Sequence, residues 1–126
     1  MKQLLFSTLL LTCAIAFADD AKNEWHNTTL SDATIKKIQA SRYQYHKCIA
    51  REMQAAAALK QDIRSGTEAI VKKCENELAV IRKVYIEEKV PAVIADRHLK
   101  QLRLQSTRNV LKQMMFAEAA RKANQQ

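Results

Sequence analysis

Residues 71–85, VKKCENELAVIRKVY, decide the fold that we expect for this chain of 126 residues. Apolar and aromatic side chains recur in this stretch at alternating steps of three and four residues: Val71, Cys74, Leu78, Ile81 and Tyr85. That spacing is typical of the apolar face of an α-helix that packs against other helices. The chain has one glycine and one proline, too few for the turns of a β-structure. The sequence therefore predicts an all-α fold.

A longer amphipathic stretch precedes these residues. Ser31 is a good N-cap, and Asp32 suits the first turn of a helix. From there, nine positions follow at steps of three and four residues, and seven of them are apolar or aromatic: Ile35, Ile38, Arg42, Tyr45, Ile49, Glu52, Ala56, Leu59 and Ile63. The pattern predicts a first helix with Cys48 at the edge of its apolar face.

A third helix is expected to begin at Pro91, because proline suits the first helical position, and to run to about Ala123. Its main apolar positions are Val93, Ile94, Leu99, Leu102, Val110, Leu111, Met114 and Ala117. The expected architecture is a three-helix antiparallel bundle. A single helical domain then spans residues 31–126, after an irregular lead-in at residues 19–30.

Residues 1–18 have the layout of a cleavable secretory signal: an early lysine, an apolar run, and the small residues Ala16 and Ala18 before two acids. One alternative is a membrane anchor, for which an apolar run of about 16 residues is short. Another is a lipoprotein signal at Cys13, which a bulky threonine precedes. We expect a cleaved signal, a mature chain that begins near Asp19, and a periplasmic or secreted protein.

Cleavage would leave two cysteines, Cys48 and Cys74, and two cysteines in an oxidising compartment usually pair. We expect a disulfide that joins the first two helices, in preference to a redox-active or metal-binding thiol pair. In an antiparallel pair of helices, this bridge places the centre of the turn near residue 61.

Gly66 could instead end the first helix with a positive φ, which would place the centre of the turn near residue 66. Ser65 and Glu68 would then form a capping box for the next helix. The two placements differ by about 15 Å of helix rise, too far for a disulfide. We favour a first helix that stops near Leu59, with residues 60–66 as an extended turn, over steeply crossed helices.

The residues that could carry chemistry form no recognisable motif. His26, His46 and His98 lie at no metal-ligand spacing, and the chain lacks paired CxxC or HExxH motifs. A single glycine cannot build a phosphate-binding loop. We therefore expect no metal site, no cofactor and no enzymatic activity.

Charge provides the best functional lead. The formal net charge is +8, and residues 97–126 contain seven basic residues against Glu118 alone. We predict that basic and soft apolar side chains of the third helix bind a partner; these are Arg97, Lys100, Arg103, Arg108, Lys112, Met114, Met115 and Phe116. The alternatives are a basic face that only aids solubility and, for the methionines and phenylalanine, a place in the core.

The start of the first helix, Leu30-Ser31-Asp32-Ala33-Thr34, resembles the LTxxQ box of the Spy/CpxP group of periplasmic helical chaperones, with serine for threonine and threonine for glutamine. The match covers five residues, and we assign the chain to no family on that basis.

The expected function is that of a small exported, chaperone-like or accessory binding protein of the bacterial envelope. Its partner would be an anionic or unfolded protein, or an anionic envelope surface; export argues against nucleic acid. The alternatives are a dedicated inhibitor or immunity protein against one envelope-targeting enzyme, and a structural subunit of an envelope assembly. The seam at residues 71–85 leaves room for a homodimer.

Overall fold

The computed structural model describes residues 30–57 and 62–125, and these residues form four α-helices. The helices are α1 (Asp32–Ala57), α2 (Ile63–Lys73), α3 (Glu75–Glu87) and α4 (Ala92–Ala123). The described part of the chain is all-helical, as predicted, but the prediction of three helices is wrong. The expected second helix is divided at Cys74. The expected signal at 1–18 and nearly all of the lead-in lie outside the described residues.

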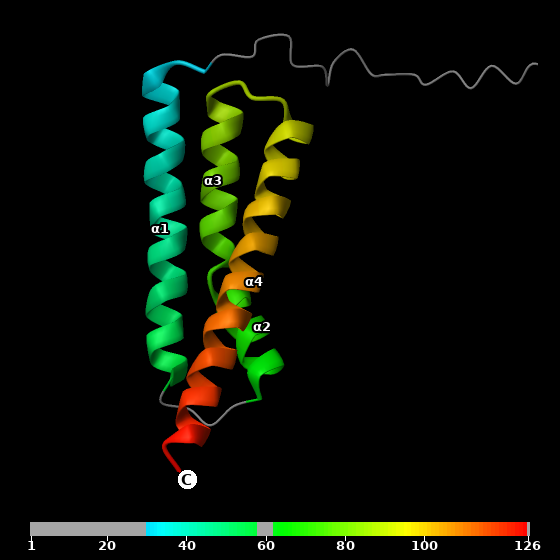
Figure 1. Ribbon diagram of the computed structural model, residues 1–126. Coiled ribbons are helices and arrows are strands. Elements are labelled where there is room, and N and C mark those ends of the chain that lie inside the picture. Colours follow the sequence, from blue (N-terminus) through cyan, green and yellow to red (C-terminus); the bar gives the residue numbers. More distant parts are fainter. Residues whose placement is uncertain (1–29, 58–61, 126) are drawn as a thin grey trace, which may run out of the picture.

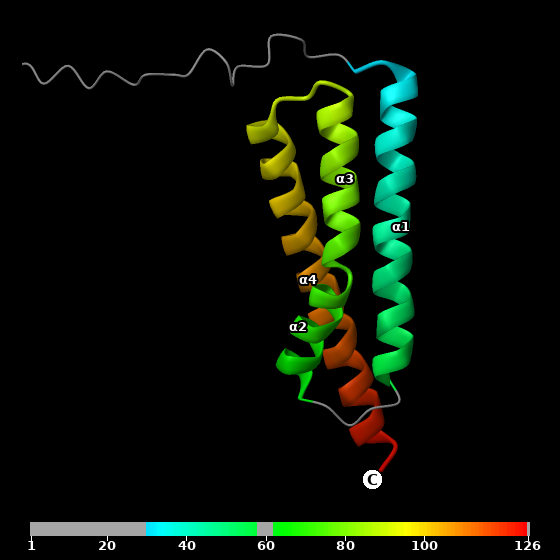
Figure 2. The same ribbon diagram turned by 180° about the vertical axis from the view of Figure 1, so that it is seen from behind.

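The helices run alternately up and down the molecule (Figures 1 and 2). α1 descends, α2 and α3 ascend one after the other, and α4 descends again along both of them. α3 packs mainly against α1, whereas α2 packs mainly against α4. The main packing partner of the ascending chain therefore changes at Cys74, from α4 for α2 to α1 for α3.

The seam at residues 71–85 forms the middle of the core, as its spacing predicted. Its five apolar and aromatic side chains are each at most 8 % exposed. They pack with side chains of α1 and α4, among them Ile38, Tyr45, Ile49, Ala95, Leu102 and Val110. The seam is thus filled within the chain. Three of the main apolar positions of the expected third helix are instead exposed: Val93, Leu111 and Ala117.

The beginning of α1 agrees with the sequence. Ser31 caps the helix, and its Oγ accepts a hydrogen bond of 3.1 Å from the Thr34 amide. The described part of α1 extends to Ala57, and Leu59, the expected end of the first helix, lies outside the described residues. The extended turn over residues 60–66 is wrong, however, because α2 already begins at Ile63.

Asp62, which lies within the expected turn, explains this correction. Its carboxylate accepts a hydrogen bond of 3.0 Å from the Ser65 amide and so caps α2. Ser65 is therefore inside the helix and is not its N-cap. Gly66 is also inside α2, buried and without a positive φ. An aspartate at the N-cap is enough to start a helix three residues before the serine that we expected.

The backbone at Cys74 tightens into a turn between α2 and α3. The Cys74 amide donates to the Val71 carbonyl at 3.2 Å, and the Cys74 carbonyl accepts from the Glu77 amide at 3.1 Å. Both bonds span three residues, as in a 3₁₀ turn, instead of four. At the other end of α3, Lys89 has a φ of 61°, and Pro91 occupies the cap position before α4.

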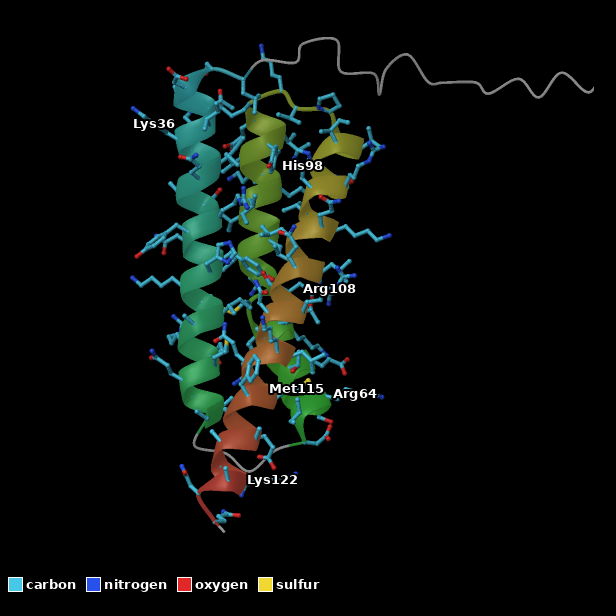
Figure 3. All side chains as sticks on the ribbon, viewed as in Figure 1. Lys36, Arg64, His98, Arg108, Met115 and Lys122 are labelled. Carbon is cyan, nitrogen blue, oxygen red and sulfur yellow. A yellow bond between two sulfur atoms is a disulfide. The ribbon has the colours of Figure 1, made fainter. Side chains whose placement is uncertain are left out.

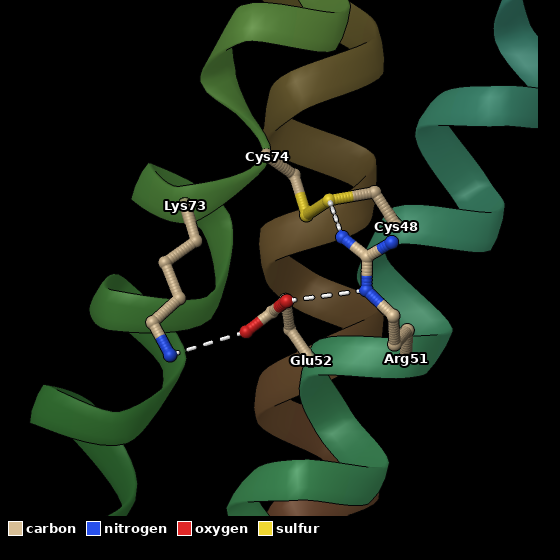
Figure 4. The surroundings of a disulfide bond; sticks show 5 residues. All are labelled: Cys48, Arg51, Glu52, Lys73 and Cys74. Atoms are coloured by element: carbon tan, nitrogen blue, oxygen red, sulfur yellow. Dashed lines mark hydrogen bonds and ion pairs between the residues drawn. A yellow bond between two sulfur atoms is a disulfide. The ribbon is translucent and has the colours of Figure 1, made fainter.

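The predicted disulfide is present and joins Cys48 of α1 to Cys74, with the two Cα atoms 5.9 Å apart. Figure 4 shows its surroundings. The Arg51 guanidinium lies 3.8 Å from the Cys48 sulfur. Glu52 bridges the two helices beside the disulfide, pairing with Lys73 of α2 at 3.1 Å. Charged side chains thus cover a cross-link that is itself buried.

A second tie holds α1 to the end of α3. The Thr34 hydroxyl donates to a Glu88 carboxylate oxygen at 2.6 Å, and the Lys37 ammonium pairs with the other oxygen. Thr34 lies 14 residues before Cys48, and Glu88 lies 14 residues after Cys74. Both ties therefore keep the same antiparallel register, with its centre at residue 61, as the position of the cysteines predicted.

The disulfide is expected to contribute a large share of the stability. Cys48→Ala/Cys74→Ala should lower the free energy of unfolding by about 3–4 kcal/mol, because the bridge closes a loop between residues 26 apart. Urea unfolding of the variant, with the oxidised and reduced wild type as references, measures this effect. An unfolding midpoint that reduction leaves unchanged would contradict the prediction.

Glu88 is expected to make stability depend on pH. Its hydrogen bonds from Lys37 and then Thr34 lower the pKa of its carboxyl group. A lowered folded-state pKa stabilises the fold above the ordinary value, about pH 4.3, and this contribution disappears as the pH falls through the folded-state value. Glu88→Gln should therefore lower stability at pH 7, and the difference from the wild type should vanish in acid. Glu87→Gln, on the exposed side of α3, is the matched control. Thermal unfolding of both variants and the wild type is measured from pH 7 to pH 3. An equal effect of the two substitutions would refute this role of Glu88.

Candidate functional site

α4 has two opposite faces. Leu102, Ser106 and Val110 follow one another at steps of four residues and are buried against the other helices. Six residues, spaced three or four apart, lie on the opposite side of the helix. At about 100° of rotation per residue, they fall within an arc of about 80° around the helix axis. We call these residues the α4 stripe: Arg97, Lys100, Leu104, Arg108, Leu111 and Met115. All six are exposed.

Three large apolar side chains lie on the α4 stripe. Leu104 is 47 % exposed, Leu111 37 % and Met115 56 %. Single exposed apolar residues are ordinary on a protein surface. A group of them along one helix face, with basic residues between them, is typical of a surface that binds another protein.

The basic residues of the α4 stripe are not engaged by acids. Within residues 30–57 and 62–125, Arg97, Lys100 and Arg108 have no ion-pair partner within 4 Å. Figure 3 shows the Arg108 side chain extending away from the other helices. By contrast Arg103, on the neighbouring face, pairs with Glu75 of α3 at 3.2 Å. The stripe thus keeps three cations available to a partner.

A groove adjoins the lower half of the α4 stripe. It lies between α2 and α4 and has a volume of about 750 Å³. Arg103, Thr107, Leu111 and Met115 line it from α4. Ile63 and Val71 contribute apolar surface from α2. Arg64 of α2 lines the same groove as Met115, and both are labelled in Figure 3. The stripe and the groove form one continuous surface.

The predicted partner-binding residues do not all belong to this surface. The structure places Arg97, Lys100, Arg108 and Met115 on the α4 stripe. Lys112 and Phe116 lie together on another face, with the Lys112 ammonium 5.8 Å from the centre of the Phe116 ring.

Met114 is turned inward, and its sulfur lies 3.4 Å from the Thr67 hydroxyl. Leu104 and Leu111 belong to the stripe but were not among the predicted residues. The three- and four-residue spacing from Arg97 places them on the same face as this residue, but only the packing of α4 shows that this face is exposed.

Other chemistry-bearing groups are engaged elsewhere. Cys48 and Cys74 form the disulfide. The His98 ring lies 3.4 Å from the Tyr85 hydroxyl, so it belongs to the contact between α3 and α4. Among the described residues, no group of three His, Cys, Asp or Glu side chains is arranged to hold a metal ion. None of the four described helices has the length and apolar character required to cross a membrane.

In comparisons with known proteins, no family model, no curated protein sequence and no solved structure matches this chain.

Two leucines of α4 test the division between its faces. Leu102→Ala should lower the free energy of unfolding by about 2–5 kcal/mol, because Leu102 is 7 % exposed. Leu104→Ala should change it by no more than about 0.5 kcal/mol, because an exposed side chain leaves no cavity. Chemical denaturation of both variants compares the same substitution on the two faces. A large loss from Leu104→Ala would mean that this face supports the fold.

Proposed function

We propose that this protein is a small exported binding protein of the bacterial envelope, without catalytic activity, and that its α4 stripe holds acidic, partly apolar segments of other proteins. The observation that carries this proposal is the α4 stripe itself. It combines three exposed apolar side chains with three cations that no described acid neutralises.

The two kinds of side chain have different roles in binding. Covering Leu104, Leu111 and Met115 would remove apolar surface from water, at about 25 cal/mol per Å². Arg97, Lys100 and Arg108 would attract acidic residues and increase the association rate. Methionine adapts to partners of different shape. This property favours a chaperone-like role over recognition of one fixed surface.

The disulfide supports the proposed location. It is compatible with an oxidising extracellular compartment, because disulfides persist there and are rare in the cytosol. Together with the signal-like layout of residues 1–18, it favours export.

A charge-reversal variant tests the proposed surface. The probe is a synthetic acidic amphipathic peptide, with leucine at helical spacing and glutamate between the leucines. Its binding to oxidised protein, followed by fluorescence anisotropy, should weaken as salt increases. Arg97→Glu/Lys100→Glu/Arg108→Glu should reduce its affinity by about tenfold or more, since each lost ion pair contributes up to about 1 kcal/mol.

The matched control is Lys36→Glu/Lys47→Glu/Lys72→Glu, which changes the net charge equally on exposed parts of α1 and α2. Its affinity should fall much less. Equal losses in both variants would mean that only net charge matters, and would contradict a specific surface.

A pull-down from envelope extract with residues 19–126 then separates the alternatives. Many salt-sensitive clients support the chaperone-like role. One stoichiometric partner would support an inhibitor or an assembly subunit instead.

A further inference from the structure

A second hollow lies between α1 and α4, separate from the groove beside α2. Its volume is about 440 Å³, and it shares no lining residue with that groove. Residues 46–57 of α1 and 106–113 of α4 contribute its walls. This volume falls within the range of small-molecule sites.

The hollow contains a buried hydroxyl without a partner. Ser106 lines it, is only 4 % exposed, and its Oγ makes no hydrogen bond to any described residue. A serine or threonine inside a helix commonly donates to the carbonyl four residues earlier. The adjacent Thr107 does so, with a bond of 2.8 Å to the Arg103 carbonyl. Ser106 makes no such bond, so its hydroxyl has no partner among the described residues.

The Tyr45 hydroxyl is a second unpartnered group in the same region. Tyr45 is completely buried, and its oxygen has no hydrogen-bond partner among the described residues. Burial raises the pKa of this phenol, and the nearby Ser106 hydroxyl acts in the opposite direction. The two hydroxyls are therefore close to each other, although their positions do not meet the distance and angle criteria of a hydrogen bond. Buried polar groups usually have partners, and Ser106 is the one of the two that lines the hollow.

The walls of the hollow determine the kind of ligand that fits. Ile49, Met53 and Val110 offer apolar surface, and Asn109 offers a neutral amide. Among the described residues, no Asp, Glu, Lys or Arg lines the hollow, and His46 is the one titratable residue that does. Burial, followed by the Arg42 charge, lowers the pKa of this imidazole.

A charged ligand would lose its hydration in this hollow without gaining an opposite charge. We propose that the hollow between α1 and α4 binds an uncharged amphiphile. Its aliphatic chain lies against Ile49 and Met53, and its hydroxyl or carboxamide head pairs with the Ser106 hydroxyl.

Three probes of equal chain length test the proposal: 1-octanol, octanoate and octylammonium. Each is titrated into the oxidised full chain, and backbone amide shifts are followed by NMR. The alcohol should give saturable shifts at Ser106 and Asn109, and the two ions should bind much more weakly. Shifts centred on Leu111 and Met115 would instead place binding in the other groove and overturn the proposal.

Two variants and a control identify the contacts. Ser106→Ala should weaken binding of 1-octanol by roughly threefold to tenfold, the effect of one neutral hydrogen bond. Ala50→Trp, which fills the hollow from α1, should abolish it. Thr107→Ala, one residue away on the other groove, should leave it unchanged. Thermal unfolding establishes that each variant is folded.

Unchanged affinity of folded Ser106→Ala, equal binding of octanoate, or no saturable shift would each overturn the proposal; the last result would mean that only water satisfies these hydroxyls. The site does not use the α4 stripe, so its test is independent of the proposed protein binding.

Discussion

The Cys48–Cys74 cross-link is the constraint on which the rest of the structure depends. It fixes α1 against the ascending part of the chain at one register, and the hydrogen bond between Thr34 and Glu88 continues that register to the far end of α3. Because the two ties agree, the apolar faces of α1 and α3 meet along their whole shared length. α4 then closes the core with one face only. A cross-link in a small domain can thus determine which side of a later helix remains free.

Much of this fold was predictable because its signals are local. A serine cap, a proline and the three- and four-residue spacing set where helices begin and which residues they bury. The position of the two cysteines predicted the centre of the turn. The division at Cys74 was not predictable, since the apolar spacing continues through it unchanged. Gly66 was misinterpreted because glycine often ends a helix, whereas here Asp62 had already started the next one.

The candidate site was only partly predictable for a different reason. The excess of basic residues in the last helix is visible in the sequence, and it identified Arg97, Lys100 and Arg108. α4, however, carries apolar residues on more than one side, and spacing alone cannot say which side faces the core. Packing against α3 and α2 buries Leu102 and leaves Leu104 in solvent. The combination of cations and apolar side chains on one face therefore emerged only from the tertiary structure.

The central claim is that the outward face of α4 binds protein segments while its inward face maintains the fold. The most direct measurement is methyl NMR of the oxidised protein, with labelled leucine and methionine, during titration with an acidic amphipathic peptide. The account predicts shifts at the methyl groups of Leu104, Leu111 and Met115, with Leu102 and Leu78 unaffected. Shifts spread through the buried leucines, or confined to another helix, would contradict it.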